Sequence, residues 1–189
     1  MEFAIPISRF DQSNVKWGAP RSGALKQTVG FNYSDSSTHM LSLILILEPL
    51  EVVFIDWTRN QINMKENEAY MSFLSKIHQF QKSVHSRICK SAKEWLGQEC
   101  ISDSAPVITQ PLLKSGILTL YLSSDPSIIT FRTQSGIQEL SKETLKPGDL
   151  IRIVVKLYGA SLQMSESNIW TGRSRIQHTI LQIFKVDPL

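Results

Sequence analysis

The feature that most constrains the fold is the stretch Leu118–Val186, in which short apolar runs alternate with turn residues. Pro126, Gly136 and the pair Pro147-Gly148 mark turns, and the runs between them are rich in Ile, Leu and Val. About five short strands joined by tight turns are typical of a small barrel or sandwich. The sequence therefore predicts that the C-terminal part of the chain is a compact β structure.

The N-terminal half predicts further strands and one long helix. Strands are expected at Lys26–Tyr33, Met40–Leu47 and Val52–Trp57, with a hairpin turn at Glu48–Glu51 between the last two. Apolar residues recur at steps of three and four over Glu66–Leu96, which indicates an amphipathic helix. Gly97, directly after this segment, is expected to cap the C-terminus of the helix. The surface of the helix carries no evident basic stripe.

The predicted class is α+β, with an OB-like antiparallel β-barrel, extra N-terminal strands and one long helix. Residues 1–25 lack a clear period and are expected to form an irregular arm. Residues 26–189 are expected to form a single OB-like domain, with the helix inserted near 66–96. The arm is interpreted either as a solvated tail or as a basic segment that touches nucleic acid, because it holds several Lys and Arg residues.

Bulk charge and cysteine content narrow the classes of function. The chain has 20 Lys and Arg against 17 Asp and Glu, and its net charge of +3 favours a nucleic-acid partner only if the cations cluster. Cys89 and Cys100 do not make a disulfide framework, which is typical of a reducing compartment. With no recognisable signal peptide or membrane-spanning run, we expect a soluble protein inside the cell, in cytoplasm or nucleus.

The sequence shows no motif that indicates catalysis or a cofactor. It contains no phosphate-binding glycine loop ending in Gly-Lys-Ser/Thr and no nucleophile elbow. His78, His85 and Cys89 would share one helix face, but a zinc site needs a fourth ligand, and we interpret them as a helix flank. We therefore expect a non-enzymatic protein without a metal.

Alternation in the strand Leu150–Tyr158 separates a core face from a face that can bind a ligand. Its odd-numbered positions from Ile151 to Leu157 are apolar, whereas Arg152, Lys156 and Tyr158 lie on the other face. Cations that contact phosphates and aromatic rings that stack on bases are the requirements of single-stranded nucleic-acid binding. The predicted nucleic-acid-binding residues are Trp170, Tyr158, Tyr121, Arg152, Lys156, Arg173, Arg175 and Arg132.

The runs Leu145–Gly159, Ile169-Trp170 and Ile180–Val186 carry a resemblance to a known family. A Lys-Pro-Gly turn, an apolar strand, a glycine, a tryptophan and a closing strand resemble the C-terminal end of the single-stranded-DNA-binding proteins of large nucleocytoplasmic DNA viruses. The resemblance implies an OB-fold core and sequence-tolerant coating of single-stranded DNA during replication, repair or recombination. It also implies replication proteins as partners and, for a viral protein, the replication compartment of the host cell.

Two other functions stay open. The chain could be a structural or protein-interaction module, such as a capsid or assembly subunit that uses strand edges and the helix face. RNA binding differs from DNA binding by recognition of the 2′-hydroxyl, which the sequence does not address. The expected partner is single-stranded DNA, with a homo-oligomer as a further expectation and no membrane partner.

Overall fold

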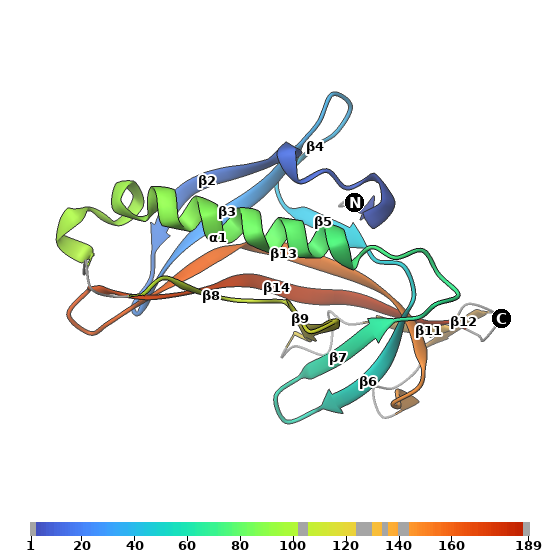
Figure 1. Cartoon of the computed structure of the whole chain (residues 1–189). Helices are drawn as coiled ribbons and strands as arrows, with labels where there is room; N and C mark the ends of the chain where they lie inside the picture. Colours follow the sequence, from blue (N-terminus) through green and yellow to red (C-terminus); the bar gives the residue numbers. More distant parts are fainter. Residues whose placement is uncertain (1–2, 102–105, 124–129, 134–135, 140–143, 187–189) are drawn as a thin grey trace.

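The computed structural model describes residues 3–101, 106–123, 130–133, 136–139 and 144–186. Two long strands, β13 (Leu150–Met164) and β14 (Trp170–Val186), form an antiparallel hairpin at the centre of the sheet (Figure 1). Both strands alternate between apolar and polar residues over most of their length, so each presents one buried face. All other major strands are arranged around this hairpin.

One edge of β13 receives three strands in succession. β6 (Leu50–Asp56) pairs with its first residues, β5 (Leu43–Ile46) with its middle and β3 (Lys26–Ser34) with its end. The remaining strands are β1 (Ile5–Pro6), β2 (Val15–Ser22), β4 (His39–Met40), β7 (Gln61–Glu66), β8 (Ile108–Gln110), β9 (Leu113–Lys114), β10 (Ile117–Tyr121), β11 (Thr130–Thr133) and β12 (Gly136–Glu139). Short 3-10 turns occupy Ile7–Arg9, Gln12–Asn14 and Gln98–Cys100.

The predicted α+β class is confirmed, but the sheet is mixed. Strands β8 and β11 run parallel to β14, and β1 runs parallel to β5. The main path of the sheet runs β12-β11-β14-β13-β6-β7-β10-β9, and its described strands do not close into a barrel. Closure into the expected OB-like antiparallel barrel is therefore not shown.

Two predictions for the N-terminal strands require correction. Within residues 1–25, β2 pairs along β3, so this segment is not an irregular arm. Gly18 and Pro20 obscured the strand pattern, because they coincide with a bulge between Trp17 and Pro20. The expected hairpin at Glu48–Glu51 is also absent: β5 and β6 both pair with β13, and β6 forms its hairpin with β7.

The long helix, α1 (Leu74–Leu96), lies along the central hairpin (Figure 1) and packs against it through one apolar face. The Phe80 ring has its centroid 5.7 Å from that of Phe10 and 5.6 Å from that of Phe31, both in edge-to-face geometry. Gly97 caps the helix as expected, with a φ of 84° and its amide bonded to Lys93 O. Within the described residues, no helix is both long and apolar enough to cross a membrane.

The helix begins eight residues later than the apolar period indicates, because Glu66 has a different role. Glu66 ends β7, and its Oε1 accepts hydrogen bonds from Ser72 Oγ, Phe73 N and Leu74 N at 2.7–2.9 Å. Phe73 is the N-cap of α1 and Leu74 its first residue, and amides at this end of a helix have no intrahelical acceptor. Partial burial would raise the pKa of Glu66, but the bonds from Leu74, Ser72 and Phe73 together hold it below its ordinary value of 4.5.

Glu66→Ala should therefore destabilise the protein by about 1 kcal/mol, the usual cost of a lost helix cap. Because the folded-state pKa is lowered, this contribution is present above pH 4.5 and is lost as the pH falls through the folded pKa. Urea unfolding at neutral and acid pH measures both effects. Glu68→Ala is the control, since Glu68 is exposed; equal losses in the two variants would contradict the capping role.

Gly159 marks a place where the backbones of β13 and β3 approach closely. A Cβ atom on Gly159 would meet the carbonyl oxygen of Val29 and would lie 2.9 Å from the Cα of Gly30. Both neighbours are backbone atoms of β3, which cannot rotate away. This position in the hairpin thus requires a glycine for steric reasons.

Gly159→Ala should lower the free energy of unfolding by about 3 kcal/mol, as expected when a strand is forced apart from its neighbour. Gly18 lies nearby on β2, where a Cβ would be 3.7 Å from Gly30 O, an ordinary contact. Gly18→Ala should thus change stability by no more than about 0.5 kcal/mol. Urea denaturation compares the two alanine variants, and similar stability in both would refute the close approach.

Candidate functional site

The two faces of β14 have different partners. Ser174 Oγ lies 3.0 Å from Thr109 Oγ1 on β8, which in turn lies 2.9 Å from His85 Nδ1 on α1. Ser174 is therefore directed to the helix side of the sheet and is buried. Arg173 and Arg175 alternate with Ser174 and are exposed, so they are directed to the opposite face.

On that opposite face, two adjoining hollows with volumes of about 460 and 540 Å³ share Lys26, Gln110 and Arg175. We call this continuous depression the β14 groove. Its basic residues are Lys26, Arg173 and Arg175, and none of its described lining residues is acidic. The three cations also make no ion pair with any described acidic residue. The groove is therefore strongly electropositive although the chain as a whole is nearly neutral.

Exposed apolar and aromatic side chains line the same groove. Three of the large apolar side chains that are exposed in the described residues lie here: Leu25, Ile108 and Tyr158 are 56%, 53% and 41% exposed. Tyr121 of β10 adds a second ring, 5.6 Å from the His178 ring in a tilted arrangement. Cations beside accessible rings form a surface that can bind an anionic ligand with flat, apolar parts.

His178 closes one side of the groove and is fixed in its neutral form. Its Nε2 accepts a hydrogen bond from Tyr121 N at 3.0 Å, so its Nδ1 carries the proton and donates to Ile176 O at 3.1 Å. Burial lowers the pKa of His178 below its ordinary value of 6.5; the bond to Ile176 opposes this shift and the charge of Arg175 adds to it. A neutral imidazole thus links β10 to β14.

This geometry predicts that acid weakens the fold at β10. Because the folded-state pKa is lowered, the contribution of His178 is complete above pH 6.5 and is lost as the pH falls through the folded pKa. Urea unfolding at about pH 7.5 and 5.5 should show a decrease in stability that is smaller in His178→Gln. His78→Gln, on the exposed side of α1, should keep the full decrease. An unchanged pH dependence in His178→Gln would contradict the assignment.

The structure brings four of the predicted binding residues together. Tyr121, Tyr158, Arg173 and Arg175 all line the groove. Lys156 lies beside them, with its Nζ 5.8 Å from the centroid of the Tyr158 ring. Tyr158 is the extra residue of a bulge, because Leu157 and Gly159 pair with consecutive residues of β14.

The other three predicted residues lie elsewhere. Trp170 is only 5% exposed and donates from Nε1 to Arg173 O at 3.0 Å, so the predicted stacking role is corrected to a core role. Arg152 forms an ion pair with Glu48 at 3.6 Å, near the start of β13 and about 20 Å along the strand from Tyr158. Arg132 pairs through its backbone with Phe184, the residue that also pairs with Arg152, so its strand position is at that same distant end.

Sequence reasoning missed His178 and the glutamines at 110, 163 and 177 that line the groove. The glutamines carried no signal, since polar residues on strands are ordinary. Lys26 was predicted only as the first residue of a strand and not as a binding residue. The one available signal was the position of Gln177, two residues after Arg175 on an alternating strand and so on the same face.

Two of the three residues considered for metal binding, His85 and Cys89, are engaged in other contacts. His85 Nδ1 lies 2.9 Å from Thr109 Oγ1, and its Nε2 lies 3.6 Å from Cys89 Sγ, whereas His78 is exposed. In the described part of the chain, His, Cys, Asp and Glu form no group of three that could hold a metal ion.

Neither a protein-family model nor a curated protein sequence matches this chain.

Proposed function

We propose that the chain binds single-stranded DNA with little sequence preference, and that the β14 groove holds the strand. The observation that carries the proposal is the composition of the groove: Lys26, Arg173 and Arg175 surround Tyr121 and Tyr158, with no acidic residue among the described lining. The proposed role is non-enzymatic and lies in replication, repair or recombination. An OB-like arrangement of the C-terminal strands and a relation to the viral DNA-binding proteins belong to the same proposal.

The chemistry of the groove fits an unpaired strand for a physical reason. Cations attract the phosphates of any sequence, and every base has a face that can stack on a tyrosine ring. Tyr158 is available for this, since it projects from a bulge and remains 41% exposed. Lys156, 5.8 Å from that ring, places a charge where the phosphate next to a stacked base would lie. Two depressions of about 460 and 540 Å³ leave room for more than one nucleotide.

The double variant Arg173→Gln/Arg175→Gln should weaken binding to an oligo-dT and should reduce its salt dependence. Each phosphate contact contributes about −0.7 to the slope of log affinity against log salt, so the loss of two contacts should change the slope by about 1.4. The control is Arg59→Gln/Lys65→Gln on the β6–β7 hairpin, which removes the same charge from two residues that do not line the groove. Fluorescence anisotropy at two salt concentrations measures both quantities.

Absence of binding by the unmodified protein at low salt would refute the proposal. Equal losses in the groove variant and in the control would show that net charge, and not the groove, determines affinity. A parallel titration with an oligo-U separates DNA from RNA, because only RNA offers a 2′-hydroxyl. Light scattering of the protein alone tests the assembly function, which would give large particles without nucleic acid.

Tyr158→Ala tests stacking separately from charge. Loss of one stacked base corresponds to about tenfold weaker binding, with an unchanged salt slope because no phosphate contact is removed. Tyr158 is on the surface, so the variant should keep its stability toward urea. An affinity equal to that of the unmodified protein would exclude Tyr158 as a stacking residue.

A further inference from the structure

The solvent face of α1 carries an excess of positive charge. Lys82, Arg87, Lys90 and Lys93 are exposed on it, and Glu94 is the only acidic residue of the helix. Counting Lys76, the helix has five basic residues against one acidic residue, a net charge of +4, whereas the whole chain has +3. The expectation that the helix lacks a basic stripe is therefore wrong.

Helix stability does not account for this charge. Lys90 and Lys93 lie near the C-terminus of α1, where cations interact favourably with the helix dipole. Lys82 and Arg87 lie in the middle, where the dipole gives no such benefit. Lys82, Arg87 and Lys90 also form no ion pair with a described acidic residue, and Glu94 alone cannot offset the repulsion among the five basic residues of the helix. An anionic partner would offset it.

An aromatic stack borders this basic face. Arg87 lies over the Trp95 ring at 6.0 Å from its centroid. Trp95 in turn stacks on Trp17 of β2, with the centroids 5.4 Å apart and the rings inclined by 25°. Arg87 is thus oriented by a cation–π contact, which restrains the guanidinium while it stays exposed to solvent.

The anionic partner is better matched by a phosphate backbone than by a membrane. An interfacial helix binds a membrane by inserting its apolar face, but Ile77, Phe80 and Ile88 of α1 are buried in the core. What remains outside is a row of charges without large exposed apolar side chains. From Lys82 to Lys93 the row extends about 16 Å, which spans several phosphates of one strand.

This basic face and the β14 groove lie on opposite sides of the sheet. Ser174 and its chain of contacts to His85 place α1 on one side of β14, and Arg173 and Arg175 are directed to the other. A short strand bound in the groove cannot reach the outer face of α1. The two surfaces therefore accept separate segments of a polyanion.

We propose that the exposed basic face of α1, formed by Lys82, Arg87, Lys90 and Lys93, binds the phosphate backbone of a second nucleic-acid segment. One protein molecule then holds two segments at once, and bridging is added to coating. The bridging part rests on the proposed function, since the first segment occupies the β14 groove. The α1 contact is made to phosphates alone and is independent of base sequence.

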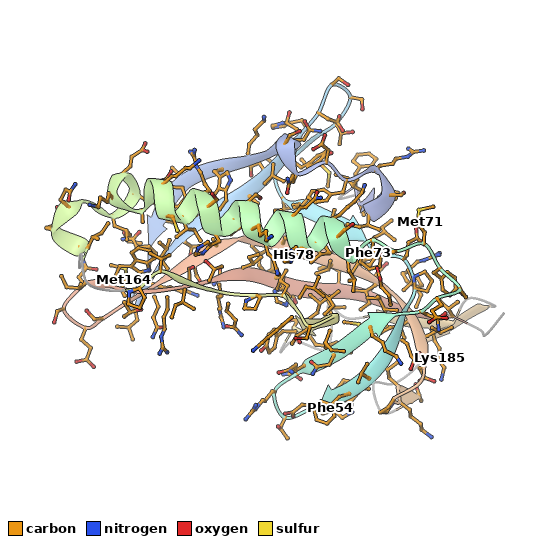
Figure 2. The ribbon with its side chains drawn as sticks, in the orientation of Figure 1. Phe54, Met71, Phe73, His78, Met164 and Lys185 are labelled. Atoms are coloured by element: carbon orange, nitrogen blue, oxygen red, sulfur yellow. The ribbon has the colours of Figure 1, made fainter. Side chains whose placement is uncertain are left out.

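The test uses oligo-dT of about eight nucleotides, within the usual site size for one binding groove, labelled with donor or acceptor dyes. The helix variant is Lys82→Gln/Lys90→Gln, the groove variant is Arg173→Gln/Arg175→Gln, and the control is Arg59→Gln/Lys65→Gln. All three pairs remove two charges from surface positions. The control pair lies on the β6–β7 hairpin, outside both the groove lining and α1, and Figure 2 shows Phe54 of this hairpin well apart from His78 of α1. Anisotropy gives the stoichiometry, and energy transfer between the dyes reports bridging.

The unmodified protein and the control should bind two oligonucleotides per molecule and give energy transfer. Each of the other variants should bind one and lose the transfer. Energy transfer that persists in the helix variant overturns the proposal. Such a result is expected if protein dimers, each with two grooves, bring the oligonucleotides together. A groove variant without any binding also overturns it, because the α1 face then holds nothing by itself.

The two proposals fail in different ways. If the helix variant loses all binding and the groove variant loses none, the groove function falls and the α1 face remains the single site. If the unmodified protein binds one oligonucleotide, and only the groove variant weakens that binding, coating stands and bridging falls. Binding to phosphatidylserine vesicles that is as strong as binding to oligo-dT, and equally sensitive to the helix variant, would reassign the α1 face to anionic surfaces in general.

Discussion

The pairing of β13 with β14 is the constraint on which the other features depend. β14 occupies one edge of β13, so β6, β5 and β3 can pair only along its other edge, each at its own stretch. One face of this long ribbon is covered by α1, and the other remains open as the β14 groove. Bulges in β13 shift the register, and the one at Tyr158 turns an exposed ring into the groove. The pairing of β13 with β14 therefore determines both which face of the sheet packs in the core and which face stays open.

The parts of the fold that sequence predicts are those governed by local alternation. The strand Leu150–Tyr158 is such a case, since its apolar positions are buried and Arg152 and Tyr158 are exposed. Pairing between distant strands carries no local signal, and so the hairpin expected at Glu48–Glu51 gave way to two separate contacts with β13. The helix start was misplaced because Glu66 stabilises α1 from the preceding strand, through its side chain alone.

The candidate site was predictable to the extent that its residues lie on one strand. Arg173 and Arg175 share a face of β14 by simple alternation, and Tyr158 follows from the same rule on β13. Lys26 and Gln110 join them only because β3 and β8 pair with the ends of that hairpin. Local sequence could not predict the burial of Trp170. A tryptophan beside a turn has the same sequence pattern whether its ring is exposed or packed in the core.

The small net charge of the chain conceals a strong separation of charge. The helix α1 carries +4, and the three cations of the β14 groove add +3, so the remaining residues together carry −4. At physiological ionic strength the field of an exposed charge decays over about 8 Å, a distance shorter than the width of the sheet and helix layers between the two surfaces. Each basic surface therefore attracts polyanions independently, while the acidic remainder disfavours indiscriminate binding elsewhere on the molecule. Local composition, and not the total charge, decides whether such a chain can hold nucleic acid.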